Sequence, residues 1–113
     1  MFQLALESPL PTVRYLMIYS ALMLLAKVTG RAADPKHVKQ SDVDDMLRLE
    51  DPSIPLAPQP GHATKQETVF RKVRNDFVHA EGRGRDPATA AKEMGSHVDR
   101  FKNLAARIVA AVP

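Results

Sequence analysis

The sequence predicts an all-α fold, a small bundle of three to four main helices with additional short helices. Apolar residues recur at helical spacing in two long stretches, and no run alternates Val, Ile or Thr with polar residues as a half-buried strand would. The 113 residues can build one hydrophobic core but not two, so residues 1–113 are expected to form a single domain. Aromatic residues make up only 5% of the chain, with no Trp, which predicts a core of Leu, Val, Met and Ala.

The first expected helix covers residues 11–28. Proline suits the first helical position, where its missing N–H needs no partner, and Gly30 can supply the left-handed turn that ends the helix. Apolar residues lie on nearly every side, which favours a central position or burial by a second chain. The most apolar stretch, 15–26, is shorter than the roughly 20 residues of a membrane span. With no basic leader sequence, we expect a cytoplasmic protein and no membrane partner.

The middle of the chain is polar and rich in proline. Ser41 and Asp44 resemble a weak capping signal for a short helix that reaches to about residue 50. Four prolines fall between positions 52 and 60, which forbids a helix there. We therefore expect residues 51–63 to form an extended, proline-rich connector on the surface of the domain.

The C-terminal half is predicted to form a helical hairpin. Thr64 and Glu67 fit a capping box, so the first of its helices is expected to begin at 64 and to stop near Gly82. Asp86 and Pro87 then suit the start of a last helix. Its apolar residues alternate steps of three and four, a pattern that suits an intramolecular core and also a subunit contact. They are Ala91, Met94, Val98, Phe101, Ala105, Ile108 and Val112.

Charge is unevenly distributed along the chain. The net charge is +3, but residues 1–63 carry −1 and residues 64–113 carry +4, so a polyanion would favour the second half. The absence of cysteine excludes disulfides, a thiol nucleophile and a cysteine-ligated zinc site. The four histidines have no metal-ligand spacing, and we expect neither a metal site nor a cofactor.

Three residues near the end of the first hairpin helix could carry chemistry. Asn75 and His79 are four residues apart, so they are expected on one helix face, opposite the apolar stripe, with Arg74 able to swing toward them. Arginine's planar fork suits phosphate oxygens, and histidine titrates near neutral pH, as a general acid or base requires. Together such groups can cleave RNA through its own 2′-hydroxyl without a metal. The candidate nucleic-acid-binding residues around them are Arg71, Arg83 and Arg85.

The pattern Arg74-Asn75-x-x-x-His79, before a last long helix, resembles the R-x4–6-H motif of HEPN domains. The context is similar too, with a hydrophobic early helix and a variable middle. The resemblance implies an all-α bundle that forms a homodimer, with two copies of the motif in a shared cleft. It also implies a metal-independent endoribonuclease of the toxin–antitoxin or phage-defence type. Arg74 would then neutralise the phosphate of single-stranded RNA, His79 would act as general acid or base, and Asn75 would support them.

A non-catalytic interaction module is the second hypothesis. Such a module would use the apolar first helix to bind a protein partner, such as an antitoxin or a nucleotidyltransferase, or would bind a nucleotide. Arg74 would then be a surface arginine that pairs with Asp76 or another acid, and His79 would be a helix C-cap. Copurification of a cognate protein, with no nuclease activity after its removal, would favour this hypothesis.

Overall fold

The computed structural model describes residues 10–62 and 64–112. Helices dominate this part of the chain, which confirms the predicted all-α class, and their number fits the predicted three to four. In chain order the elements are α2 (Pro11–Val28), α3 (Gln40–Glu50), β1 (Leu56–Pro58), β2 (Gln66–Thr68), α4 (Val69–Val78) and α5 (Pro87–Ala110).

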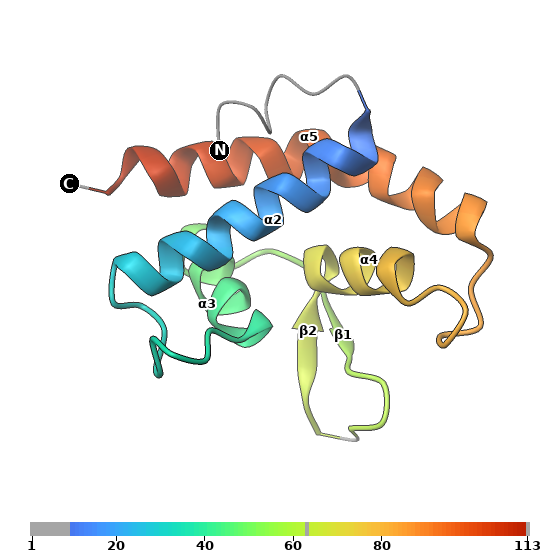
Figure 1. Ribbon diagram of the computed structural model, residues 1–113, viewed down its shortest axis with the longest axis horizontal. Helices are drawn as coiled ribbons and strands as arrows, with labels where there is room; N and C mark the ends of the chain where they lie inside the picture. The colour runs from blue at the N-terminus through green and yellow to red at the C-terminus, as the bar shows by residue number, and fades with distance from the viewer. Residues whose placement is uncertain (1–9, 63, 113) are drawn as a thin grey trace.

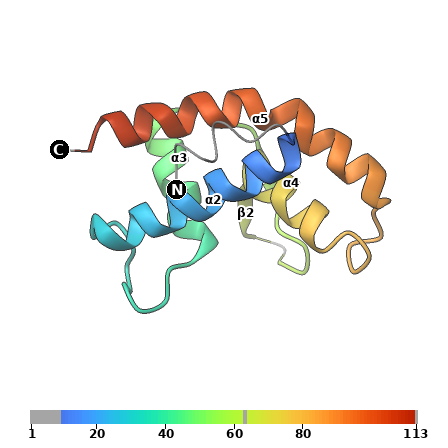
Figure 2. The ribbon, with the colours of Figure 1, turned by 45° about the horizontal axis from the view of Figure 1, so that its top comes forward.

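The two long helices, α2 and α5, run in the same direction, and α3 and α4 lie on one side of this pair (Figure 1). Gly95 of α5 faces Pro11 at the start of α2, and Phe101 contacts Tyr15 further along. The second view shows α2 and α5 side by side as well (Figure 2). The short helix α4 runs back antiparallel to α5 (Figure 1). The hydrophobic core lies where these helices meet.

α2 occupies the predicted residues and buries one of its faces. Gly30, with a φ of 71°, follows its end as expected. The buried residues are Tyr15, Ile18, Tyr19, Leu22 and Ala26. Leu24 and Val28 are exposed, as are Val13 and the N-cap residue Leu10. The other helices therefore cover only one side of α2, and the predicted burial on nearly every side is not found within the described chain. None of the helices in the described residues combines the length and apolar character that crossing a membrane requires.

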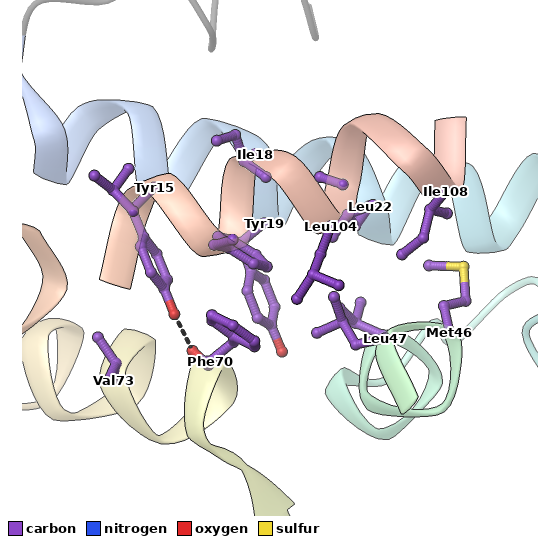
Figure 3. Packing of buried hydrophobic residues seen from close by; sticks show 14 of the residues in the cluster. Tyr15, Ile18, Tyr19, Leu22, Met46, Leu47, Phe70, Val73, Leu104 and Ile108 are labelled. Atoms are coloured by element: carbon purple, nitrogen blue, oxygen red, sulfur yellow. Dashed lines mark hydrogen bonds between the residues drawn. The ribbon is translucent and has the colours of Figure 1, made fainter. Parts of the chain in front are cut away.

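Aromatic rings occupy the centre of the core, so the expectation of a purely aliphatic core is wrong. The ring centre of Phe101 lies 4.5 Å from that of Tyr15 and 5.1 Å from that of Phe70. The Tyr15 hydroxyl donates a 2.6 Å hydrogen bond to the carbonyl oxygen of Phe70, which fastens α2 to the start of α4 (Figure 3). A few rings suffice because each one buries a large apolar area.

The first residue of α3, Gln40, precedes the predicted cap residue, Ser41. The Asp42 carboxylate accepts a 2.8 Å hydrogen bond from the N–H of Lys39, which precedes the first helical residue, Gln40. The helix is therefore capped around Lys39 and Asp42, two residues before the predicted pair Ser41 and Asp44. The side chains that α3 buries in the core are Val43, Met46 and Leu47.

A short β-hairpin replaces part of the predicted connector. β1 and β2 pair antiparallel with Leu56 opposite Thr68, and the Val69 N–H donates a 3.0 Å hydrogen bond to the Pro55 carbonyl oxygen. The expectation of no strands is wrong here, because strands of three residues are too short to produce a readable alternation. Pro58 is tolerated because each strand of a two-stranded sheet is an edge strand.

α4 begins later and ends earlier than predicted. Residues 66–68 belong to β2, so the helix starts at Val69, and the Thr68 hydroxyl caps it by accepting a 3.2 Å hydrogen bond from the Arg71 N–H. The predicted Thr64 cap is therefore wrong. The helix ends at Val78, four residues before Gly82.

α5 begins as predicted and has more buried residues than α2, α3 or α4. The Asp86 side chain accepts a hydrogen bond from the Thr89 N–H, and Pro87 is the first helical residue. Ala91 and Val112 are only half-buried at the ends of the predicted seam. The seam itself is intramolecular core, with the buried residues Ala90, Met94, Val98, Phe101, Leu104, Ala105 and Ile108.

Candidate functional site

Arg74 lies on α4, where two neighbours fix its guanidinium. Its Nη1 donates a 2.7 Å hydrogen bond to Oδ1 of Asn75, and its Cζ lies 5.6 Å from the ring centre of Tyr19 on α2. No second hydrogen bond joins this guanidinium, which carries five N–H donors, to a side chain or backbone group of the described residues. No carboxylate of the described residues forms an ion pair with Arg74, because Asp76 binds other cations. The suggested pairing of Arg74 with Asp76 is therefore wrong, and within residues 10–62 and 64–112 no acid compensates the charge of this arginine.

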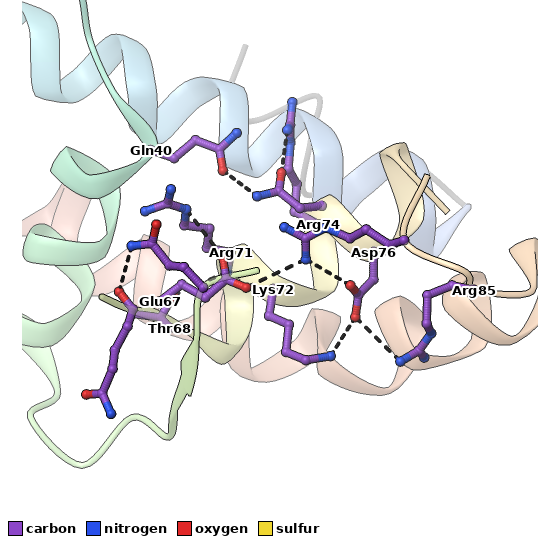
Figure 4. Close-up of polar contacts among 12 residues, drawn as sticks. Gln40, Glu67, Thr68, Arg71, Lys72, Arg74, Asp76 and Arg85 are labelled. Atoms are coloured by element: carbon purple, nitrogen blue, oxygen red, sulfur yellow. Dashed lines mark hydrogen bonds and ion pairs between the residues drawn. The ribbon is translucent and has the colours of Figure 1, made fainter. Parts of the chain in front are cut away.

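Asn75 is buried, with 6% of its surface exposed. Its Nδ2 donates a 2.7 Å hydrogen bond to Oε1 of Gln40, the first residue of α3 (Figure 4). The expectation of an open face shared with His79 is wrong for Asn75, because Gln40 covers that side of α4. Sequence reasoning missed Gln40, which lies 35 positions away and belongs to no motif.

His79 is exposed and follows the last residue of α4. Its backbone N–H donates a 2.8 Å hydrogen bond to the Asn75 carbonyl oxygen, so it is the C-cap residue of the helix. Its imidazole makes no hydrogen bond to a described residue and faces solvent, where a ligand can reach it. The structure thus brings Arg74 and Asn75 together, and it leaves the His79 side chain unattached to either.

The other three predicted arginines are bound to carboxylates of the same chain. The ion pairs with these carboxylates compensate the charges of the three arginines, which therefore contribute to the folded structure (Figure 4). The pairs are Arg71 with Asp44 (3.3 Å), Arg83 with Asp76 (2.9 Å), Arg85 with Asp76 (3.6 Å) and Arg85 with Glu93.

Two buried carboxylates of this cluster differ in their electrostatics. Burial alone would raise the pKa of Asp76, but hydrogen bonds from Lys72 (2.6 Å) and Arg83 (2.9 Å) outweigh it and hold that pKa below its ordinary value. Burial raises the pKa of Glu67, despite the nearby cations. Arg71 and Arg83 approach Glu67 only to 3.5 and 3.6 Å, and its Oε1 has no hydrogen-bond partner in the described part of the chain.

Sequence reasoning also missed the roles of two acids. Glu67 was assigned to a capping box and Asp44 to a weak cap, but both are buried counter-ions of Arg71. Asp44 also accepts a 2.6 Å hydrogen bond from the Thr68 hydroxyl, which ties α3 to the start of α4. Burial raises the pKa of Asp44 against the effect of these partners. Local patterns give no sign of either role, because the partners come together only in the folded chain.

Comparisons with known proteins identify no relative. A scan against models of protein families finds no match, and no curated protein or solved structure matches this chain. Within residues 10–62 and 64–112, no three metal-ligating side chains are grouped closely enough to hold an ion. The resemblance to HEPN domains therefore stays a prediction.

Proposed function

We propose that this chain is a metal-independent endoribonuclease of the HEPN type that cleaves single-stranded RNA, in a toxin–antitoxin or phage-defence role. One observation carries the proposal. The guanidinium of Arg74, which pairs with no carboxylate of the described residues, is fixed by Asn75 about one and a half helical turns before the exposed His79. An arginine held for a purely structural purpose would be expected to pair with a carboxylate, as Arg71, Arg83 and Arg85 do.

The reaction would need only these groups and the substrate's own 2′-hydroxyl. The 2′-oxygen forms a bond to the adjacent phosphorus as the bond to the 5′-oxygen breaks. A base takes the 2′-hydroxyl proton, and an acid protonates the departing 5′-oxygen. Arg74 would stabilise the extra negative charge on the phosphate oxygens, and His79 would act as the acid or the base. The products are a 2′,3′-cyclic phosphate and a 5′-hydroxyl.

A homodimer would supply the second proton-transfer group. One imidazole cannot be base and acid in the same step, but His79 from each of two copies can fill both roles. The exposed apolar residues of α2 support such an interface, because at 100° per residue they fall within about 60° of one another. They are Val13, Leu24 and Val28, together with the N-cap residue Leu10.

The same exposed face of α2 favours the second candidate function, a non-catalytic interaction module. A partner protein, such as an antitoxin or a nucleotidyltransferase, could cover this face in place of a second copy. That function, or nucleotide binding, would give the uncompensated Arg74 no catalytic role. The two candidates therefore differ in whether Arg74 and His79 are needed for any chemistry.

Cleavage of a labelled single-stranded RNA in EDTA tests the proposal. The parent chain is expected to cut and leave a 2′,3′-cyclic phosphate, and His79→Ala is expected to cut at least about 100-fold more slowly because a proton-transfer group is lost. The melting temperature should hardly change, since the His79 side chain is exposed.

His62→Ala is the matched control, because His62 is also exposed but lies in the hairpin loop. It should cut at the parent rate. A His79→Ala variant that cuts as fast as the parent would contradict the proposed role of His79. An inactive parent that copurifies with a cognate protein would favour the interaction module.

A further inference from the structure

Gln40 joins α3 to the candidate site through a chain of side-chain hydrogen bonds. Its Oε1 accepts the 2.7 Å hydrogen bond from Nδ2 of Asn75, and Oδ1 of Asn75 accepts the 2.7 Å hydrogen bond from Arg74. Figure 4 shows Gln40 reaching from the start of α3 toward α4. The side chain that orients Arg74 is thus itself held by a residue from another helix.

The direction of these hydrogen bonds determines how the Asn75 amide is turned. An amide has an acceptor oxygen on one side and an NH₂ donor of nearly the same shape on the other. When the NH₂ group of Asn75 faces Gln40, its carbonyl oxygen faces Arg74 and can accept a hydrogen bond from the guanidinium. In the opposite orientation the NH₂ group would face the guanidinium, and two donors cannot bind each other. An acceptor at position 40 therefore favours the orientation that holds Arg74.

The held guanidinium has little freedom left. Asn75 binds it through Nη1, and the Tyr19 ring lies beside it. Asn75 and Tyr19 are both buried, so neither can move far without disturbing the core. Loss of the acceptor at position 40 would release the Asn75 amide, and the guanidinium would lose its fixed partner.

We propose that Gln40 is a positioning residue, which holds Arg74 in its phosphate-binding orientation through the Asn75 amide. This inference rests on the proposed RNA cleavage for its functional consequence, but the linkage itself concerns only side chains of the described chain. A merely structural role of Gln40 would change stability and leave the environment of the Arg74 guanidinium unaltered.

Two substitutions separate acceptor chemistry from packing. Gln40→Leu removes the acceptor and keeps a side chain of similar size, whereas Gln40→Glu keeps an acceptor oxygen. Gln59→Leu is the matched control, because Gln59 also forms a hydrogen bond through its side-chain amide, as a donor to the Gln66 carbonyl oxygen at 3.0 Å, but lies in the hairpin. For each variant, kcat and KM for RNA cleavage are measured together with the melting temperature.

Gln40→Leu is expected to lower kcat about tenfold, whereas Gln40→Glu and Gln59→Leu should stay within about twofold of the parent chain. In ¹H–¹⁵N spectra, the side-chain signals of Arg74 (Nε–Hε) and Asn75 (Nδ2–H₂) should move in Gln40→Leu and keep their environment in Gln59→Leu. In Gln40→Glu the Arg74 signal should stay close to that of the parent.

An unchanged Arg74 signal in Gln40→Leu would overturn the inference, as would equal losses of kcat in the Leu and Glu variants. The spectra need no RNA and no activity. If the parent chain does not cleave RNA, the proposed function fails, and the spectra still decide whether Gln40 orients Arg74.

Discussion

Arg74→Lys is expected to lower RNA cleavage about 100-fold or more while the melting temperature stays within a few degrees of the parent's. The guanidinium can donate to Asn75 and to two phosphate oxygens at once, because its N–H groups are fixed in one plane. An ammonium group keeps the charge but is a single point on a flexible stem, so it cannot reproduce that geometry. Single-turnover cleavage of a labelled RNA, with melting curves of both chains, measures the effect.

Arg83→Lys is the control for this experiment. Arg83 was a candidate for RNA contact, but its guanidinium pairs with Asp76 and Glu67 inside the chain. A lysine can still pair with these acids, so cleavage should stay within about threefold of the parent rate while stability falls modestly. Equal losses of cleavage in the Arg74 and Arg83 variants would contradict the distinct roles assigned to the two arginines.

Asp76→Asn is expected to destabilise the fold by about 2 kcal/mol at pH 7. Removing one partner of a fully buried ion pair costs about 3–5 kcal/mol, and the cations around Asp76 are partly exposed, which lets water compensate some of the loss. For a domain of this size the change corresponds to a melting temperature lower by roughly 8 °C. Chemical denaturation and thermal melting of the purified variant both measure it.

Glu67→Gln, in the same cluster, is expected not to destabilise the fold at pH 7. The variant should be at least as stable as the parent chain. The raised pKa of Glu67 means that its charged form is less favourable in the folded chain than in the unfolded chain. A neutral amide of the same shape removes that cost. Clear destabilisation by Glu67→Gln would contradict this account of the cluster.

The two acids should also differ in their dependence on pH. The lowered pKa of Asp76 gives stability that is present above the unfolded value of about 3.9 and is lost as the pH falls through the folded pKa. The cost of Asp76→Asn should therefore shrink in acid. Glu67 has a raised folded pKa, so its ionisation takes stability away as the pH rises above about 4.3. The stability of Glu67→Gln relative to the parent chain should therefore increase as the pH rises over that range.

The long helices could be predicted because their signals are local. Proline at the first turn and a regular apolar seam define α5, and the apolar run from Tyr15 to Ala26 defines most of α2. The start of α4 could not be predicted in the same way, because the capping-box pattern pointed to Thr64 and the structure uses Thr68. The choice between them is made by the pairing of residues 66–68 with β1, which no local pattern reports.

The candidate site was predictable in composition but not in geometry. The residue types of Arg74, Asn75 and His79 suggested phosphate chemistry, and the helical wheel placed Asn75 on an open face. Its burial depends on Gln40, which reaches it from another helix. Similarly, the positive charge of the C-terminal half suggested several RNA contacts, and most of that charge near the motif is compensated by acids from α3, β2, α4 and α5.

The parallel pairing of α2 with α5 has a consequence for synthesis on the ribosome. Tyr15 and Tyr19 pack against Phe101, so the buried face of α2 has to wait until some 80 further residues have been added, roughly 4–16 s at typical rates. During that interval the apolar face of α2 is not covered by α5, and chaperones can bind it. Arg74 rests beside Tyr19, so the guanidinium also reaches its final surroundings late. In ribosome-bound chains stalled before α5 has left the exit tunnel, a protease should cut near Tyr15. Protection of α2 in such chains would contradict the late packing of α2 against α5.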